Sequence, residues 1–152
     1  MGMFITGIII ATFMAASKKI LFVCVENAGR SQIAEAFARR LGIDAVSAGT
    51  VPASKVNEIV VSVMRKRGID ISSRRPKLLT GEMIDEADLV VTMGCSVEEV
   101  CPRPLLNRLK KNSIDWHIDD PKGKTVDEVG RICDEIEEKV LGLFRELQAK
   151  PH

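Results

Sequence analysis

The chain has 152 residues, of which 45% are apolar, 22 are Lys or Arg and 21 are Asp or Glu. This length fits one domain of ordinary size with a real hydrophobic core. The balanced charge and the few aromatic residues, five Phe, one Trp and no Tyr, argue against a nucleic-acid-binding surface.

Residues 1–17 form a separate N-terminal extension. The uncharged, mostly apolar run from Phe4 to Ala16 is shorter than the ~20 residues that a membrane span needs. No Lys or Arg precedes it, as one would in a signal peptide, whereas Met14 opens a plausible cytoplasmic start. A start codon placed too early, a membrane-touching extension and a signal peptide stay open. We expect one folded domain at residues 18–150, in the cytoplasm.

Short apolar runs alternate with amphipathic segments along this domain. The expected strands lie at 20–23, 45–48, 88–92 and 116–118, and the expected helices at 31–41, at 56–64 and from Thr125 onward. Such alternation predicts an α/β domain, a four-stranded parallel sheet flanked by helices. Ligands of such sheets bind beyond the carboxyl ends of the strands, where Cys24, Cys95 and the Asp119–Asp120 segment fall.

The loop after the first strand has the composition of an oxyanion site. A tight turn there directs backbone N–H groups inward, and the N-terminus of the following helix adds partial positive charge. Arg30 can offer a planar fork to two oxygens of a tetrahedral anion, and this environment favours the thiolate form of Cys24. The Ser31 hydroxyl can hydrogen-bond that thiolate, and Asn27 can brace the loop or adopt a left-handed backbone conformation. The expected oxyanion-binding residues are Val25, Glu26, Asn27, Ala28, Gly29 and Arg30.

The segment FVCVENAGRSQIAEAFARRLG resembles the low molecular weight protein tyrosine phosphatase family, and more closely its thioredoxin-coupled arsenate reductase branch. The likeness covers roughly residues 18–148 and implies that fold, Cys24 as nucleophile, oxyanion binding by Arg30 and the loop amides, and no cofactor. Some members of this branch bind potassium near the loop, which makes Asn27, Glu35 and Ser47 the candidate ligands here. No other metal site is expected.

Residues 119–121 read Asp-Asp-Pro, and a carboxyl group on a loop can protonate a leaving oxygen. In the family the acid is the Asp directly before Pro, which implies Asp120. The phosphatases usually have aromatic residues after this dipeptide, where this chain has Lys122, Gly123 and Lys124. That difference disfavours a phosphotyrosine substrate.

Reducing arsenate takes two electrons, so a reductase of this branch needs further thiols. The resemblance implies a relay in which Cys95 attacks Cys24 and Cys101 resolves the disulfide, with thioredoxin or a similar dithiol protein as reductant. Cys95 and Cys101 have five residues between them, which is too many for a zinc knuckle. A helix would hold their Cα atoms ~9 Å apart, beyond the ~7 Å of a disulfide, so we expect residues 94–104 to be mobile.

Three other features have structural interpretations. Cys133 lies on the apolar stripe of the final helix and is expected in the core. His117 is expected at the surface or in a structural role, and the Arg74–Arg75 run in a solvated loop that could edge the site.

Two other functions stay open at this point. One is a low molecular weight phosphatase acting on phosphate monoesters. The other is a phosphocysteine carrier domain, which would need neither Asp120 nor the Cys95 and Cys101 pair. In each case we expect a monomer.

Overall fold

The computed structural model describes residues 18–94, 103–109 and 112–149. The strands are β1 (Lys19–Cys24), β2 (Asp44–Gly49), β3 (Leu89–Thr92) and β4 (Ser113–Asp115). The helices are α2 (Arg30–Arg40), α3 (Glu58–Lys66), α4 (Gly81–Glu86), α6 (Arg103–Leu109) and α7 (Val126–Ala149).

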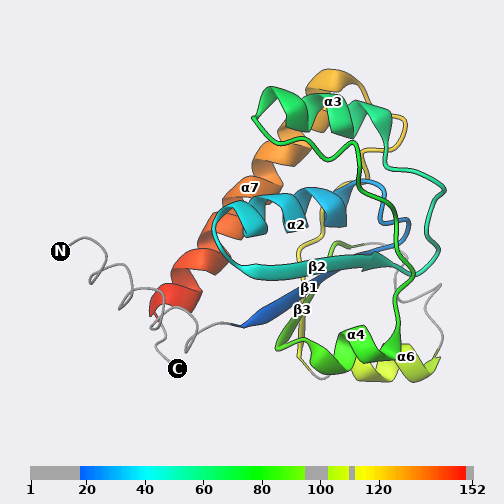
Figure 1. The fold of residues 1–152 in the computed structure, drawn as a ribbon, viewed down its shortest axis with the longest axis vertical. Coiled ribbons are helices and arrows are strands. Elements are labelled where there is room, and N and C mark those ends of the chain that lie inside the picture. The colour runs from blue at the N-terminus through cyan, green and yellow to red at the C-terminus, as the bar shows by residue number, and fades with distance from the viewer. Residues whose placement is uncertain (1–17, 95–102, 110–111, 150–152) are drawn as a thin grey trace.

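The four strands form one parallel sheet in the order β2-β1-β3-β4. The chain moves from β1 to one neighbour, β2, and then crosses to the other side of β1 to form β3 (Figure 1). This reversal leaves a crevice at the carboxyl end of β1, which is where open α/β sheets bind their ligands. The loop from Cys24 to Arg30 therefore occupies the binding position of the fold.

Helices cover both faces of the sheet. Helices α2, α3 and α7 lie on one side, and the shorter α4 and α6 lie on the other (Figure 1). Successive side chains of β1 alternate between the two layers, as a strand buried on both faces requires. Ile20, Phe22 and Cys24 join the larger core with α2 and α7, whereas Leu21 and Val23 join the smaller one.

The expected fold class is confirmed, and so are the first three strands and the three helices, within two residues at each expected boundary. The final helix begins where expected because Thr125 caps it. Its hydroxyl oxygen accepts from the Glu128 N–H at 3.2 Å, and the Glu128 carboxylate accepts from the Thr125 N–H at 3.0 Å.

The expected fourth strand at residues 116–118 is wrong by three positions, since β4 spans Ser113–Asp115. The apolar residues that suggested a strand pack instead, with Trp116 against Phe22 at 5.7 Å between ring centroids. The Asp115 carboxylate accepts from the His117 N–H at 3.0 Å, and His117 turns the chain with φ 51°.

Two helices, α4 and α6, were not predicted. Helix α4 has only six residues, too few to show a helical period, and it depends on the Thr80 hydroxyl, which accepts from the Met83 N–H. Helix α6 begins at Arg103 with Pro104 in its first turn, where proline is tolerated.

Residues 1–17 and 95–102 lie outside the described part of the chain, so the structure tests neither the expectation for the extension nor that for most of the stretch 94–104, whose last two residues begin α6. Among the described helices, none combines the length and apolar character that crossing a bilayer requires.

Candidate active site

The loop between β1 and α2 is held by the segment that follows β2. The carbonyl oxygens of Val25, Glu26 and Ala28 accept backbone hydrogen bonds of 2.8–3.0 Å from residues 51–57. Because these carbonyls bond to that segment, the N–H groups of the loop can donate hydrogen bonds on the opposite side of the loop. One of them, from Asn27, donates to the Cys24 Sγ at 3.2 Å.

Asn27 has φ 51°, the left-handed conformation that Asn tolerates better than most residues, and its side chain is buried. The orientation of its amide is set by Lys77, whose backbone N–H can only donate and lies 2.8 Å from Oδ1. Nδ2 therefore faces the other way and donates to the hydroxyls of Ser31, at 2.7 Å, and Ser47, at 3.0 Å. Asn27 both shapes the loop and orders the hydroxyls beneath it.

This orientation bears on the direction of the bond to Cys24. The Ser31 Oγ lies 2.9 Å from the Cys24 Sγ and accepts from the Asn27 Nδ2, which leaves its own proton available for donation to the sulfur. With the Asn27 N–H, the sulfur has two donors, an arrangement that suits a thiolate. Both contacts are buried.

Arg30 is buried and is held by two other segments of the chain. Its Nη1 donates to the carbonyls of Met93, at 3.1 Å, and Ile118, at 3.0 Å. Its Nη2 lies 3.7 Å from a carboxylate oxygen of Asp120. The guanidinium thus connects the end of β3 and the Asp120 loop to the loop that carries Cys24.

Asp120 has a half-exposed side chain, and its Oδ1 accepts from the Lys122 N–H at 3.0 Å. Pro121 packs directly over Gly29. A Cβ at Gly29 would lie 2.7 Å from the Pro121 Cγ, closer than carbon atoms approach, so glycine is needed there. The close packing brings Asp120 to the mouth of the same pocket as Cys24.

The pocket over Cys24 has a volume of about 430 Å³, and Asp119 does not line it. Its floor is the loop, and its walls are residues 53–59 and the turn of residues 120–122. Among the described residues that line it, none is aromatic.

Lysines that sequence reasoning missed stand at its rim. The Lys122 Nζ lies 3.0 Å from a Glu26 carboxylate oxygen, and this hydrogen bond raises the pKa of Lys122. The Lys55 Nζ pairs with Glu58 at 2.8 Å. The sequence pattern indicated only that position 122 lacks an aromatic side chain, and it gave no sign that Lys122 pairs with Glu26.

The three potassium candidates are close together, but their donor atoms do not fit a cation. The Ser47 hydroxyl donates to Glu35 at 2.5 Å, and Asn27 turns its Nδ2 to Ser47. Glu35 is buried and already pairs with Arg39 and with Arg74. In the described ranges no three acidic, His or Cys side chains gather as metal ligands would. We derive no chemistry through potassium.

The remaining expectations have mixed outcomes. Cys133 is in the core, as expected, and burial raises the pKa of its thiol to about 11. His117 is exposed, as expected. The Arg74–Arg75 run is not simply solvated, because Arg74 is only 26% exposed and pairs with Glu35. Cys95 and Cys101 lie outside the described residues.

Comparison with known proteins places this geometry in context. A family model described as low molecular weight phosphotyrosine protein phosphatase matches residues 19–152. An arsenate reductase of Brevibacillus brevis is 37% identical over 126 residues, which cover 81% of this chain and 91% of that protein.

Two solved structures extend the comparison. The thioredoxin-dependent arsenate reductase of Corynebacterium glutamicum is 32% identical, with a TM-score of 0.69, over 92% of this chain and 70% of that one. The arginine phosphatase YwlE of Geobacillus stearothermophilus is 27% identical, with a TM-score of 0.77, over 87% of this chain and 94% of that one.

Proposed function

We propose that this chain, which belongs to the low molecular weight phosphotyrosine protein phosphatase family, is an arsenate reductase that uses Cys24 as its nucleophile. The observation that carries the proposal is the buried Cys24 sulfur. It accepts from Ser31 and the Asn27 N–H beside Arg30, in a small pocket whose described lining has no aromatic residue. An inorganic oxyanion needs no aromatic groove, whereas a phosphotyrosine ring would be expected to use one.

In the first step the Cys24 thiolate attacks arsenic and a sulfur–arsenic bond forms. One oxygen leaves as water, with Asp120 supplying a proton, and Arg30 and the loop amides bind the remaining oxygens. The 3.7 Å contact between Arg30 and Asp120 supports this pairing of roles, because it brings the acid to the edge of the anion site.

In the second step the Cys95 thiolate attacks the Cys24 sulfur. A disulfide forms, the sulfur–arsenic bond breaks, and its electron pair stays on arsenic, which leaves as arsenite. The Cys101 thiolate then attacks Cys95, and Cys24 departs as a thiolate. Two thiols have become one disulfide, which accounts for the two electrons that arsenate gained.

The position of Met93 supports a role for the residues that follow it. The Met93 carbonyl accepts a hydrogen bond from Arg30, so the chain enters the Cys95–Cys101 segment from the edge of the anion site. Regeneration requires a dithiol protein of the thioredoxin class, since the disulfide between Cys95 and Cys101 must be reduced after each turnover. We further propose that the enzyme works in the cytoplasm, where thiols stay reduced.

A second candidate is hydrolysis of phosphate monoesters, which membership of the phosphotyrosine protein phosphatase family favours. It would use Cys24, Arg30 and Asp120 and would leave Cys95 and Cys101 idle. The same first step would form a phosphocysteine, and water would release phosphate.

Substitution of Cys95 separates the two functions. Thioredoxin-coupled arsenate turnover and hydrolysis of p-nitrophenyl phosphate are measured on the parent, on Cys95→Ser and on the control Cys133→Ala. The control removes a thiol that is buried in the core and takes no part in the relay. We expect Cys95→Ser to lose arsenate turnover and keep any phosphatase activity, while the control keeps both. Arsenate turnover by Cys95→Ser at the parent's rate would show that the relay is wrong.

A further inference from the structure

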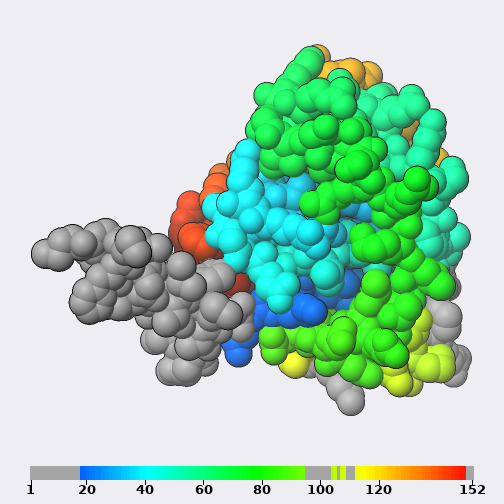
Figure 2. All heavy atoms as spheres, viewed as in Figure 1, coloured from blue at the N-terminus to red at the C-terminus, as the bar shows by residue number. Residues whose placement is uncertain are grey.

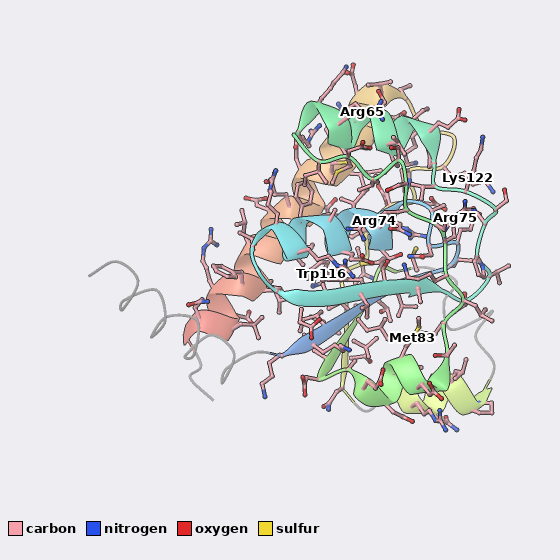
Figure 3. All side chains as sticks on the ribbon, viewed as in Figure 1. Arg65, Arg74, Arg75, Met83, Trp116 and Lys122 are labelled. Carbon is pink, nitrogen blue, oxygen red and sulfur yellow. The ribbon has the colours of Figure 1, made fainter. Side chains whose placement is uncertain are left out.

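A second cavity, of about 560 Å³, lies beside the open edge of the sheet at β2. The green chain between α3 and α4 runs past the cyan α2 and β2 on this face (Figures 1 and 2). It carries Arg74 and Arg75, and Met83 follows in α4 (Figure 3). This cavity shares no lining residue with the pocket over Cys24.

The cavity is strongly basic. Two of its lining residues are acidic, Glu35 and Glu86, and five are basic: Lys19, Arg39, Arg74, Arg75 and Lys77. Three positive charges are therefore in excess within one concave surface. A whole-chain net charge of only +1 makes such a local excess notable.

Neutralising the buried Glu35 does not account for this excess. Arg74 pairs with its carboxylate, the Arg39 Nε lies 3.2 Å from it, and the Lys77 Nζ lies 3.9 Å from it. One cation would suffice to compensate one carboxylate. Arg75 and Lys19 add two further charges, and no ion pair with an acidic side chain is found for either in the described part of the chain.

The cations also disfavour one another. Burial lowers the pKa of Lys77, and the nearby charges of Arg74 and Arg39 lower it further. Burial alone lowers the pKa of Arg74. The negative charge of an anion in the cavity would oppose both shifts by favouring the charged forms of Lys77 and Arg74.

The shape and lining indicate the class of anion. Val46 and Met83 add apolar surface to the basic side chains. Guanidinium groups bind phosphate oxygens as planar forks. At about 560 Å³ the cavity exceeds what one tetrahedral oxyanion fills, so there is room for a small organic group beside the charge.

The chain that lines the cavity is bonded to the loop of the active site. The Lys77 N–H donates to the Asn27 side chain, and Gln32 donates both to Asn27 and to the Arg75 carbonyl. The cavity and the Cys24 loop are thus two faces of one hydrogen-bonded unit.

We propose that this cavity is a second anion-binding site, separate from the catalytic loop, which takes a small phosphate-bearing anion. The proposal does not rest on arsenate reduction, because binding here involves neither Cys24 nor the relay cysteines.

Amide chemical shifts of the full chain, followed by NMR, test the proposal. A Cys24→Ala variant, which cannot turn over a phosphate ester, is titrated with inorganic phosphate and, separately, with adenosine monophosphate at constant ionic strength. We expect the amides of Ser73, Arg75 and Met83, which line the cavity, to follow one saturable curve. The loop amides, such as Gly29, should follow another. If adenosine monophosphate saturates the cavity amides at a lower concentration than inorganic phosphate does, the ligand is a phosphate ester. If it saturates them at an equal or higher concentration, the ligand is a free oxyanion. Both outcomes support the site.

Two double variants in the same background decide whether the cavity cations bind the anion. Lys19→Ala with Arg75→Ala leaves every partner of Glu35 in place and should weaken binding at the cavity by about tenfold or more. Lys66→Ala with Arg131→Ala removes the same charge from exposed positions outside the cavity and should leave the affinity unchanged. Cavity amides that shift linearly without saturation would overturn the proposal, and so would equal affinities in the two double variants.

Discussion

Removing the Ser31 hydroxyl should slow the release of Cys24 as a leaving group. In the proposed relay Cys24 departs from its disulfide as a thiolate, and negative charge returns to a sulfur that lies 2.9 Å from the Ser31 Oγ. The hydrogen bond is strongest when that charge is present, so it stabilises the transition state more than the disulfide before it. Ser31→Ala should therefore reduce the rate of the chemical steps while the fold persists.

The magnitude follows from the contact. A hydrogen bond to a charged acceptor contributes about 1.5–3 kcal/mol, which corresponds to roughly 10- to 150-fold in rate. The Asn27 N–H remains on the sulfur at 3.2 Å, so part of the stabilisation persists in the variant. We expect a loss within that range and not a complete loss of activity.

A single-turnover assay isolates these steps. Reduced enzyme is mixed with arsenate without thioredoxin, quenched at intervals, and the disulfide between Cys95 and Cys101 is measured by mass spectrometry. Thr50→Val is the matched control: the Thr50 Oγ1 is buried near the same loop and has no hydrogen-bond partner among the described residues. The control should react at the parent's rate. The reasoning is refuted if Ser31→Ala reacts as fast as the parent, or if Thr50→Val slows as much.

Three further predictions concern stability and the acid loop. The pKa of about 11 for Cys133 lies above the unfolded value near 9, so the contribution of this thiol to the free energy of unfolding should be constant below pH 9 and fall by about 2–3 kcal/mol as pH rises from 9 to 11. Urea denaturation should show this fall as the difference between the parent and Cys133→Ala, which lacks the thiol. Glu35→Gln removes the buried carboxylate to which the partly exposed Arg39 and Arg74 bind, and the loss of these charge-assisted contacts should cost about 1.5–3 kcal/mol, lowering Tm by roughly 5 °C in calorimetry; an unchanged Tm would contradict the role of this charge. Gly29→Ala should displace Pro121 and with it Asp120, and so reduce arsenate turnover. Alkylation of Cys24 by iodoacetamide, measured in a Cys95→Ser, Cys101→Ser background, should persist. Equal losses of turnover and of alkylation would indicate that the loop has collapsed instead.

The grouping of Cys24, Arg30 and Ser31, the proposed nucleophile and its supports, could be predicted from sequence because they lie within eight consecutive residues at a strand-to-helix junction. Local backbone geometry alone brings such residues together, so the sequence pattern is enough to predict that their side chains are neighbours. The core position of Cys133 was predictable for a similar reason, since helical periodicity is also a local property.

The strand at residues 116–118 failed because its apolar residues pack as irregular chain, and edge pairing selected the exposed residues of β4 instead. Apolar residues indicate that a segment is buried, but they do not indicate whether its backbone N–H and C=O groups bond to a neighbouring strand.

By itself, the sequence determined the order of the first three strands and of α2, α3 and α7, and it placed Cys24 at the head of the candidate oxyanion loop, because each depends on residues that are neighbours in the chain. The tertiary structure decided the partners of the charged residues. Arg74 meets Glu35 across 39 positions, and Lys122 meets Glu26 across 96. Nothing in a local pattern specifies such pairs, since they form only when folding brings distant segments together. For the buried Glu35, an unpaired charge would in addition be costly.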